Sequence, residues 1–197
     1  MPRAGLTRAR VASVAADVAD EVGLERLTLA AVAQRLGVSG PALYKHVAGL
    51  DALQRDVAVL ALGELTTALS AATVGRSGAD ALRGLAEAYR AYAGAHPGRL
   101  AASVRAPAPG DMEHDAASDR ALAVLVAVLS GYGIRAEDMV DALRIVRASV
   151  HGFAVLDASG GFGLPRDVEA TYARYVETLD AGLRSWALKG GPAGAEP

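Results

Sequence analysis

Three consecutive side chains, Tyr44, Lys45 and His46, combine the chemistry that contacts nucleic acid. A tyrosine ring can pack on a sugar or a thymine while its hydroxyl reaches a phosphate, and lysine or histidine can bind phosphates or base edges. Ala42, two residues earlier, is small enough to meet a thymine methyl group. An exposed tyrosine between small and basic residues has no obvious packing role, so we interpret this stretch as a surface that binds DNA.

No comparable set of residues predicts catalysis or metal binding. No histidine has a second histidine three or four residues away, and the chain has no cysteine to supply a thiolate. The motifs of nucleophile elbows, P-loops and dinucleotide-binding turns are missing from the sequence. An acidic cluster around residues 111–119 is most simply a solvated surface. We therefore expect no enzyme activity, no metal site and no cofactor.

The segment TLAAVAQRLGVSGPALYKHV, residues 28–47, predicts the elements that position these side chains. Apolar residues at helical spacing predict one helix from Thr28 to Leu36 and a second that begins at Ser39 and includes Leu43 and Val47. Gly37 provides a left-handed backbone for the tight turn, and Pro41 fits the first turn of the second helix. This pattern is typical of a helix-turn-helix. The alternative is two ordinary surface helices of a bundle.

The rest of the chain predicts an all-α protein with about nine helices. Alanine is frequent, and glycine and proline gather at a few breaks. A first helix from Thr7 to Val22 completes a three-helix N-terminal domain, and the threonines at its start and at residue 28 are good N-caps whose helix ends could each bind a phosphate. The later helices are expected at about 49–72, 79–95, 99–105, 116–129, 137–159 and 167–188, and they form a C-terminal helical bundle. The tail from residue 190 to 197 is expected to be disordered.

Charge and composition fit this interpretation. Residues 1–50 contain six basic and four acidic residues, a net charge of +2, while the other 147 residues contain 14 basic and 18 acidic ones, a net charge of −4. A mildly basic N-terminal region on an acidic body is consistent with local phosphate contacts. The absence of cysteine excludes disulfides, and no long uncharged apolar stretch predicts a membrane span or a signal peptide. We expect a cytoplasmic protein with no membrane partner.

The first 60 or so residues resemble the TetR family of transcriptional regulators. The resemblance rests on LTRARVASVAADVADEVGLERLTLAAVAQRLGVSGPALYKHVAGLDAL, which follows the order and spacing of nearly the whole family DNA-binding domain. It implies that residues of the second helix-turn-helix helix line the DNA, namely Ser39, Gly40, Pro41, Ala42, Tyr44, Lys45 and His46. It also implies backbone contacts at Thr7 and Thr28. One position departs from the family pattern, since Leu50 stands where a lysine often binds a phosphate.

The segment VRASVHGFAVLDASGGFGLPRDVEATYARYVETLDAGL, residues 146–183, resembles the last two helices of a TetR subgroup with a His-Gly pair. The resemblance implies that these two helices pack against their copies as a four-helix interface. The residues agree, because the helix at 137–159 is apolar on two sides and so should be buried on two sides. The expected dimer-interface residues are Ile145, Ala148, Gly152, Leu156, Val176, Leu179 and Leu183. The alternative is a bundle within a single chain.

The family's C-terminal domains also bind varied small molecules, and Tyr92 and Phe153 are our candidate ligand-binding residues. Both could equally be core aromatics. The sequence thus predicts a DNA-binding domain at 1–50 and a ligand-binding and dimerisation domain at 51–189. We expect a repressor that binds double-stranded operator DNA as a homodimer and is released by a small, largely apolar effector. The alternative is a helical ligand-binding or enzymatic protein that has lost DNA binding, an interpretation that only Leu50 favours.

Overall fold

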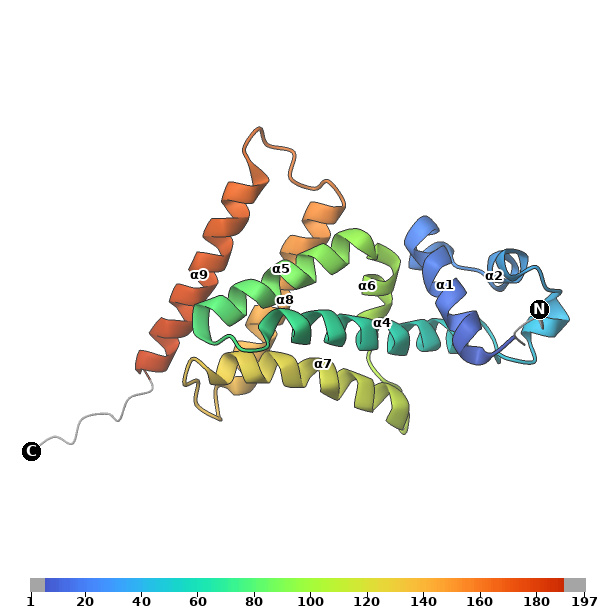
Figure 1. Ribbon diagram of the computed structural model, residues 1–197, viewed down its shortest axis with the longest axis horizontal. Helices are drawn as coiled ribbons and strands as arrows, with labels where there is room; N and C mark the ends of the chain where they lie inside the picture. The colour runs from blue at the N-terminus through green and yellow to red at the C-terminus, as the bar shows by residue number, and fades with distance from the viewer. Residues whose placement is uncertain (1–5, 190–197) are drawn as a thin grey trace, which may run out of the picture. The chain divides into compact units, whose positions relative to one another are not determined.

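The computed structural model describes residues 6–189, and over this range the protein consists of nine α-helices and one short 3-10 helix, with no strand (Figure 1). This confirms the predicted all-α fold with an N-terminal helix-turn-helix. The tail at 190–197 lies outside the described residues. The chain forms two compact units, the first from residues 1–65 and 95–120 and the second from residues 66–94 and 121–197.

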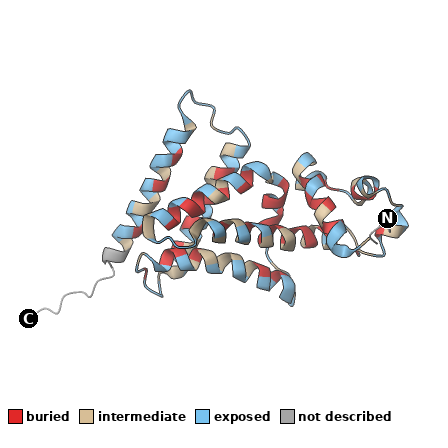
Figure 2. Ribbon diagram, viewed as in Figure 1, coloured by how far each residue is buried: buried red, intermediate tan, exposed pale blue. Residues whose placement is uncertain are grey.

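The first unit contains the helix-turn-helix. Its helices are α1 (Arg8–Val22), the 3-10 helix η1 (Leu24–Arg26), α2 (Leu29–Leu36), α3 (Gly40–Leu43), α6 (Pro97–Ser103), and the first parts of α4 (Leu50–Thr73) and α7 (Met112–Ser130). Its core is built from apolar side chains of α1 to α4, and Ala102 of α6 belongs to the same core. The helix α6 packs directly against α1, and buried residues run along both helices (Figure 2).

The second unit contains α5 (Gly78–Ala95), α8 (Met139–Ala158), α9 (Val168–Lys189) and the remaining parts of α4 and α7. Arg90 of α5 links the two C-terminal helices: its guanidinium donates hydrogen bonds to Asp157 of α8 (2.6 Å) and to both carboxylate oxygens of Glu169 of α9 (2.8 and 2.6 Å). The same guanidinium lies 4.5 Å from the centre of the Tyr172 ring. These contacts fix α5, α8 and α9 relative to one another.

Most predicted helix ends agree with the structure to within a residue or two, but three elements differ. The helix α3 ends at Leu43, earlier than expected, because the N–H of His46 donates to the carbonyl of Leu43 (2.9 Å) in a tighter turn. The helix α6 begins at Pro97, two residues before its expected start, because proline is well tolerated in the first helical turn. The helix α7 begins at Met112, four residues before its expected start at residue 116.

The helix α4 is long and apolar enough, by length and composition, to cross a membrane. Its residues Leu53, Val57 and Ala58 are completely buried in the core of the first unit. Core helices of globular proteins meet the same criterion.

Candidate nucleic-acid interface

The turn between α2 and α3 has the geometry that the sequence predicts. Gly37 has a φ of +67°, in the left-handed region that favours glycine, and its N–H donates to the carbonyl of Gln34 (3.1 Å). The N–H of Val38 then donates to the carbonyl of Ala33 (3.0 Å). These two bonds satisfy carbonyl groups at the end of α2 and turn the chain sharply into α3.

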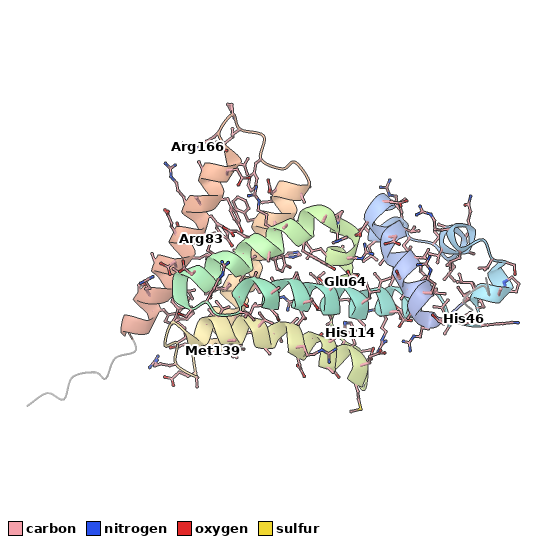
Figure 3. The ribbon with its side chains drawn as sticks, in the orientation of Figure 1. His46, Glu64, Arg83, His114, Met139 and Arg166 are labelled. Atoms are coloured by element: carbon pink, nitrogen blue, oxygen red, sulfur yellow. The ribbon has the colours of Figure 1, made fainter. Side chains whose placement is uncertain are left out.

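Buried and exposed side chains alternate after this turn. Leu43 and Val47 are only 1% and 5% exposed and anchor α3 in the core of the first unit. Tyr44 is 60% exposed and Lys45 is exposed. His46, which is labelled in Figure 3, is half-buried in the turn after α3. The predicted contact residues Tyr44 and Lys45 therefore face solvent from a rigidly anchored segment.

The start of α3 is also accessible. Ser39, Gly40 and Pro41 are exposed, and Ala42 is half-buried. Ser39 occupies the N-cap position with an extended backbone, yet its hydroxyl makes no capping hydrogen bond. A Cβ atom at Gly40 would meet no atom within 4 Å apart from its chain neighbours and its own helix backbone. The start of the helix therefore has no bulk that would keep it out of a major groove about 12 Å wide.

Thr7 and Thr28 act as N-caps, as predicted. The hydroxyl of Thr7 accepts a hydrogen bond from the N–H of Arg10 (3.2 Å), and the hydroxyl of Thr28 accepts one from the N–H of Ala31 (3.1 Å). A side-chain cap satisfies one of the four N–H groups at the start of a helix. The others remain able to bind phosphate oxygens.

Two basic residues of this region form ion pairs with carboxylates of the same unit. Arg8 is paired with Asp56 of α4, and Arg35 forms a two-point ion pair with Glu21 of α1. The hydrogen bond from Arg35 lowers the pKa of Glu21, so this carboxylate stays charged. The net charge of residues 1–50 does not distinguish these paired side chains from unpaired ones, because no local spacing in the sequence marks an ion pair between residues 14 positions apart.

Three exposed basic residues between positions 6 and 50 form no ion pair in the described part of the chain: Arg10, Arg26 and Lys45. Of these, Arg26 donates a hydrogen bond to the backbone carbonyl of Val22. Arg10 lies in the first turn of α1, beside Thr7, and the sequence interpretation did not single it out. Leu50 is the first residue of α4 and is 37% exposed, so an apolar side chain stands at the position of the family's usual lysine.

The candidate ligand residues lie in the second unit. Tyr92 is 7% exposed. Phe153 belongs to an aromatic cluster in which its ring centre lies 4.8 Å from that of Phe162 and 5.0 Å from those of Tyr172 and Tyr175. This is the packing role that the sequence left open for Phe153. Four of the seven residues that line a nearby cleft of about 420 Å³ are charged, namely Glu87, Arg90, Asp157 and Glu169.

A hydrogen bond joins Tyr89 of α5 to His151 of α8, with the Tyr89 oxygen 2.9 Å from Nδ1 of the histidine. Burial raises the pKa of Tyr89 to about 12, so its hydroxyl stays protonated. Burial also lowers the pKa of His151, and the positive charge of Arg147 lowers it further. This pair lies beside Gly152, in the His-Gly pair that the sequence singled out.

The predicted dimer residues lie on two helices, α8 and α9. On α8, Ile145 and Leu156 are each 49% exposed, Ala148 is exposed and Gly152 is half-buried. The opposite stripe of α8, with Val146 and Val150, is buried in the same unit.

The helix α9 differs from the prediction. Val176 and Leu183 are 5% and 3% exposed because they pack into the protomer's own core, while Leu179 is half-buried. The first two residues are therefore unavailable to a partner. The helical spacing identified a buried face of α9 but assigned it to the wrong neighbour.

Comparison with known proteins agrees with this geometry. A family model described as bacterial regulatory proteins of the tetR family matches residues 12–53, and a tetracyclin repressor-like C-terminal domain matches residues 82–179. An uncharacterized HTH-type transcriptional regulator of Mycobacterium tuberculosis, Rv0681, is 37% identical over 191 residues, which cover 96% of this chain and 87% of the relative. Another, YobS of Bacillus subtilis, is 31% identical over 183 residues, covering 92% and 95%.

Solved structures share the fold. A protein of unknown function from Rhodococcus sp. RHA1 superimposes with a TM-score of 0.75 at 26% identity, covering 93% of this chain and 99% of that one. BioQ of Mycobacterium smegmatis, solved with its double-stranded DNA operator, has a TM-score of 0.65 at 19% identity, covering 92% and 99%.

An anchored helix-turn-helix with an exposed tyrosine and lysine defines a DNA-binding transcriptional regulator. The chain belongs to the TetR family, as its resemblance at residues 6–53 predicts.

Proposed function

We propose that this regulator is a repressor that binds operator DNA as a homodimer and is released by a small, largely apolar effector. The observation that carries the proposal is the exposed Tyr44-Lys45 pair between two buried anchors, Leu43 and Val47. In this proposal residues 1–50 make the DNA contacts, and residues 51–189 hold the dimer and effector contacts. Because its target is DNA, we propose a cytoplasmic location.

The DNA contacts divide into base-reading and backbone-positioning residues. Ser39, Gly40, Pro41, Ala42, Tyr44 and His46 enter the major groove in this proposal. Lys45 and the helix ends at Thr7 and Thr28 bind phosphates. We add Arg10 to the phosphate contacts, since it is exposed, forms no ion pair in the described structure and lies one turn from Thr7. With Lys45 it can supply the attraction that Leu50 cannot.

The homodimer is proposed on the outer face of α8. Exposed apolar residues Ile145 and Leu156 alternate with the small residues Ala148 and Gly152, a face that allows close approach of a second helix. A symmetric dimer buries the same face of both copies. Leu179 of α9 remains in the proposed interface, and Val176 and Leu183 are removed from it because each protomer buries them already.

Release by an effector is proposed from the family's C-terminal domain, which matches residues 82–179. An effector can shift an equilibrium only if its affinities for the free and DNA-bound states differ. Coupling of this kind is typically about 1–3 kcal/mol, and it is reciprocal, so operator DNA must weaken effector binding by the same factor.

Operator selection tests the DNA-binding part directly. The full-length protein is incubated with random double-stranded DNA, bound fragments are enriched, and the affinity of the selected site is measured at several salt concentrations. The proposal predicts a palindromic site whose half-sites lie on successive major grooves, about 34 Å apart or slightly more. Failure to enrich any sequence would instead favour a helical protein that has lost DNA binding.

A further inference from the structure

Two neighbouring clefts lie between α5 and α9 of the second unit. The first is the cleft of about 420 Å³ described above, which the end of α8 also lines, and the second has a volume of about 320 Å³. Glu87, Glu169 and Tyr172 line both clefts, so the two form one groove. Arg83, which is labelled in Figure 3, lines only the second. Each cleft is large enough to hold a small molecule.

Carboxylates outnumber cations in this groove. The first cleft has three carboxylates, those of Glu87, Asp157 and Glu169, and one cation, Arg90, which gives a net charge of −2. The second cleft adds one arginine and one glutamate, so the total stays at −2. A groove of this charge repels DNA and other anions and attracts cations.

The cation of the first cleft is already engaged. All three guanidinium nitrogens of Arg90 donate hydrogen bonds, one to Asp157 Oδ2 and two to Glu169. The bonds between Arg90 and Glu169 raise the pKa of the arginine and lower that of the glutamate, so both stay charged. In the described part of the chain, Asp157 Oδ1 and both carboxylate oxygens of Glu87 accept no hydrogen bond from another side chain. An ammonium group therefore finds three available acceptors here, whereas an anion finds no available guanidinium.

Tyr172 forms the wall that the two clefts share. Its ring already has a cation over one face, since the guanidinium carbon of Arg90 lies 4.5 Å from the ring centre. The residue is 7% exposed, and its hydroxyl is buried without a hydrogen-bond partner among the described residues. An unpaired buried hydroxyl is costly, and a phenol oxygen can accept a hydrogen bond from an ammonium group. A cationic ligand in the groove would supply such a donor.

The carboxylates are spread along the groove instead of gathering at one point. On α9, Glu169, Ala173 and Glu177 follow one another at intervals of four residues, so they share one face and span about 12 Å. No group of three acidic or histidine side chains in the described part of the chain is placed to hold a metal ion. Ala91 and Gly94 of α5 add small apolar surface beside the charges. The groove therefore fits an extended organic cation better than a compact metal ion.

We propose that the groove between α5 and α9 binds an aliphatic polyamine. Glu87 and Asp157 hold one ammonium group, Glu177 holds another, and the methylene chain between them lies along Ala173 and the wall formed by Tyr172. This site carries none of the proposed DNA contacts, and its ligand differs in chemical class from the apolar effector proposed above. Its binding requires neither operator DNA nor a homodimer.

The test measures spermidine binding to the full-length protein without DNA. Calorimetry at fixed ionic strength gives the affinity, and backbone NMR shifts locate the site. The comparison ligands are butylamine, which has a single ammonium group, and octanediol, an aliphatic chain without charge. Competition with magnesium chloride, against sodium chloride at equal ionic strength, separates a divalent-cation site from a polyamine site.

Four variants at exposed positions test the residues of the groove. Ala91→Lys places an ammonium group of the protein itself in the first cleft, and Ala170→Lys adds the same charge at a position of α9 that lines neither cleft. Glu87→Gln removes an acceptor that both clefts share, and Glu25→Gln removes the same charge from the first unit. Substitutions at exposed positions of this kind should leave thermal unfolding nearly unchanged.

We expect saturable binding of spermidine, weaker binding of butylamine and none of octanediol, with NMR shifts confined to α5, the end of α8 and α9. Glu87→Gln should weaken spermidine binding by up to about 5-fold, the effect of one exposed ion pair. Ala91→Lys should weaken it by about 10-fold or more through repulsion between like charges. Ala170→Lys and Glu25→Gln should bind as the wild type does.

Equal spermidine affinities of Ala91→Lys and Ala170→Lys would overturn the proposal. So would NMR shifts spread over the acidic residues of both units, which indicate only general attraction between charges, or displacement of spermidine by magnesium but not by sodium. Because the experiment contains no DNA, its failure leaves the proposed repressor function untouched. Failure to select an operator would likewise leave this site untouched.

Discussion

Replacing Tyr44 with alanine should weaken operator binding and leave the fold intact. Because 60% of the side chain is exposed, its truncation removes little buried surface, and the free energy of unfolding should change by no more than about 0.5 kcal/mol. A lost base-level contact costs about 1–3 kcal/mol per head, or about 5- to 150-fold in affinity. In a homodimer both heads lose the contact, so the total loss can approach twice this free energy.

The neighbouring residue provides a matched control. Leu43 is 1% exposed, so Leu43→Ala should destabilise the protein by about 2–5 kcal/mol through loss of burial and creation of a cavity. Its operator affinity should fall only to the extent that the protein unfolds. The two variants therefore separate contact with DNA from support of the fold, although the residues are adjacent in sequence.

The assay combines urea unfolding with fluorescence anisotropy of a labelled operator at fixed salt. Tyr44→Ala should retain the wild-type unfolding midpoint and lose affinity for the selected operator more than for random DNA. Wild-type operator affinity in this variant would refute the assignment of α3 and the following turn as the base-reading element. A large drop in its unfolding midpoint would refute the inference that the side chain has no packing role.

Four further predictions follow from individual residues. Lys45→Ala should weaken binding to all sequences and reduce the slope of log affinity against log salt by about one per head, measured by titration at several salt concentrations; an unchanged slope would exclude a phosphate contact. Gly152→Glu should give monomers in sedimentation velocity, because a Cβ atom at this position has open space within 4 Å beyond its own helix, and the longer side chain would project into the proposed interface. Gly94→Glu, at an equally open glycine of α5, is the control, and an unaltered Gly152→Glu dimer would move the interface elsewhere. Phe153→Ala should lower the free energy of unfolding by about 3 kcal/mol through loss of its aromatic neighbours, and an unchanged thermal midpoint would contradict that packing role. Folding lowers the pKa of His151, so the unfolded state binds more protons than the folded state. The contribution of this histidine to stability is therefore complete above about pH 6.5 and is lost as the pH falls through its folded pKa. Thermal unfolding between about pH 5 and 8 should show this loss in the wild type, and an equal loss in His151→Gln would rule it out.

The sequence alone determined the features that depend on a few neighbouring residues. The left-handed turn at Gly37 and the caps at Thr7 and Thr28 are set by local backbone geometry and by hydrogen bonds that span three residues. The exposure of Tyr44 follows from its position between the buried residues Leu43 and Val47, at the end of a short helix. These local signals were sufficient to identify the helix-turn-helix.

Only the tertiary structure decided the features that depend on contacts between distant residues. Nothing local marks that Arg99 pairs with Asp20, 79 residues away, or that α6 belongs to the core of the helix-turn-helix. The spacing of Val176 and Leu183 showed that one face of α9 is buried, but an apolar stripe has no preference between a helix of its own chain and one of a partner. The neighbour that covers such a face is chosen by the packing of the whole unit.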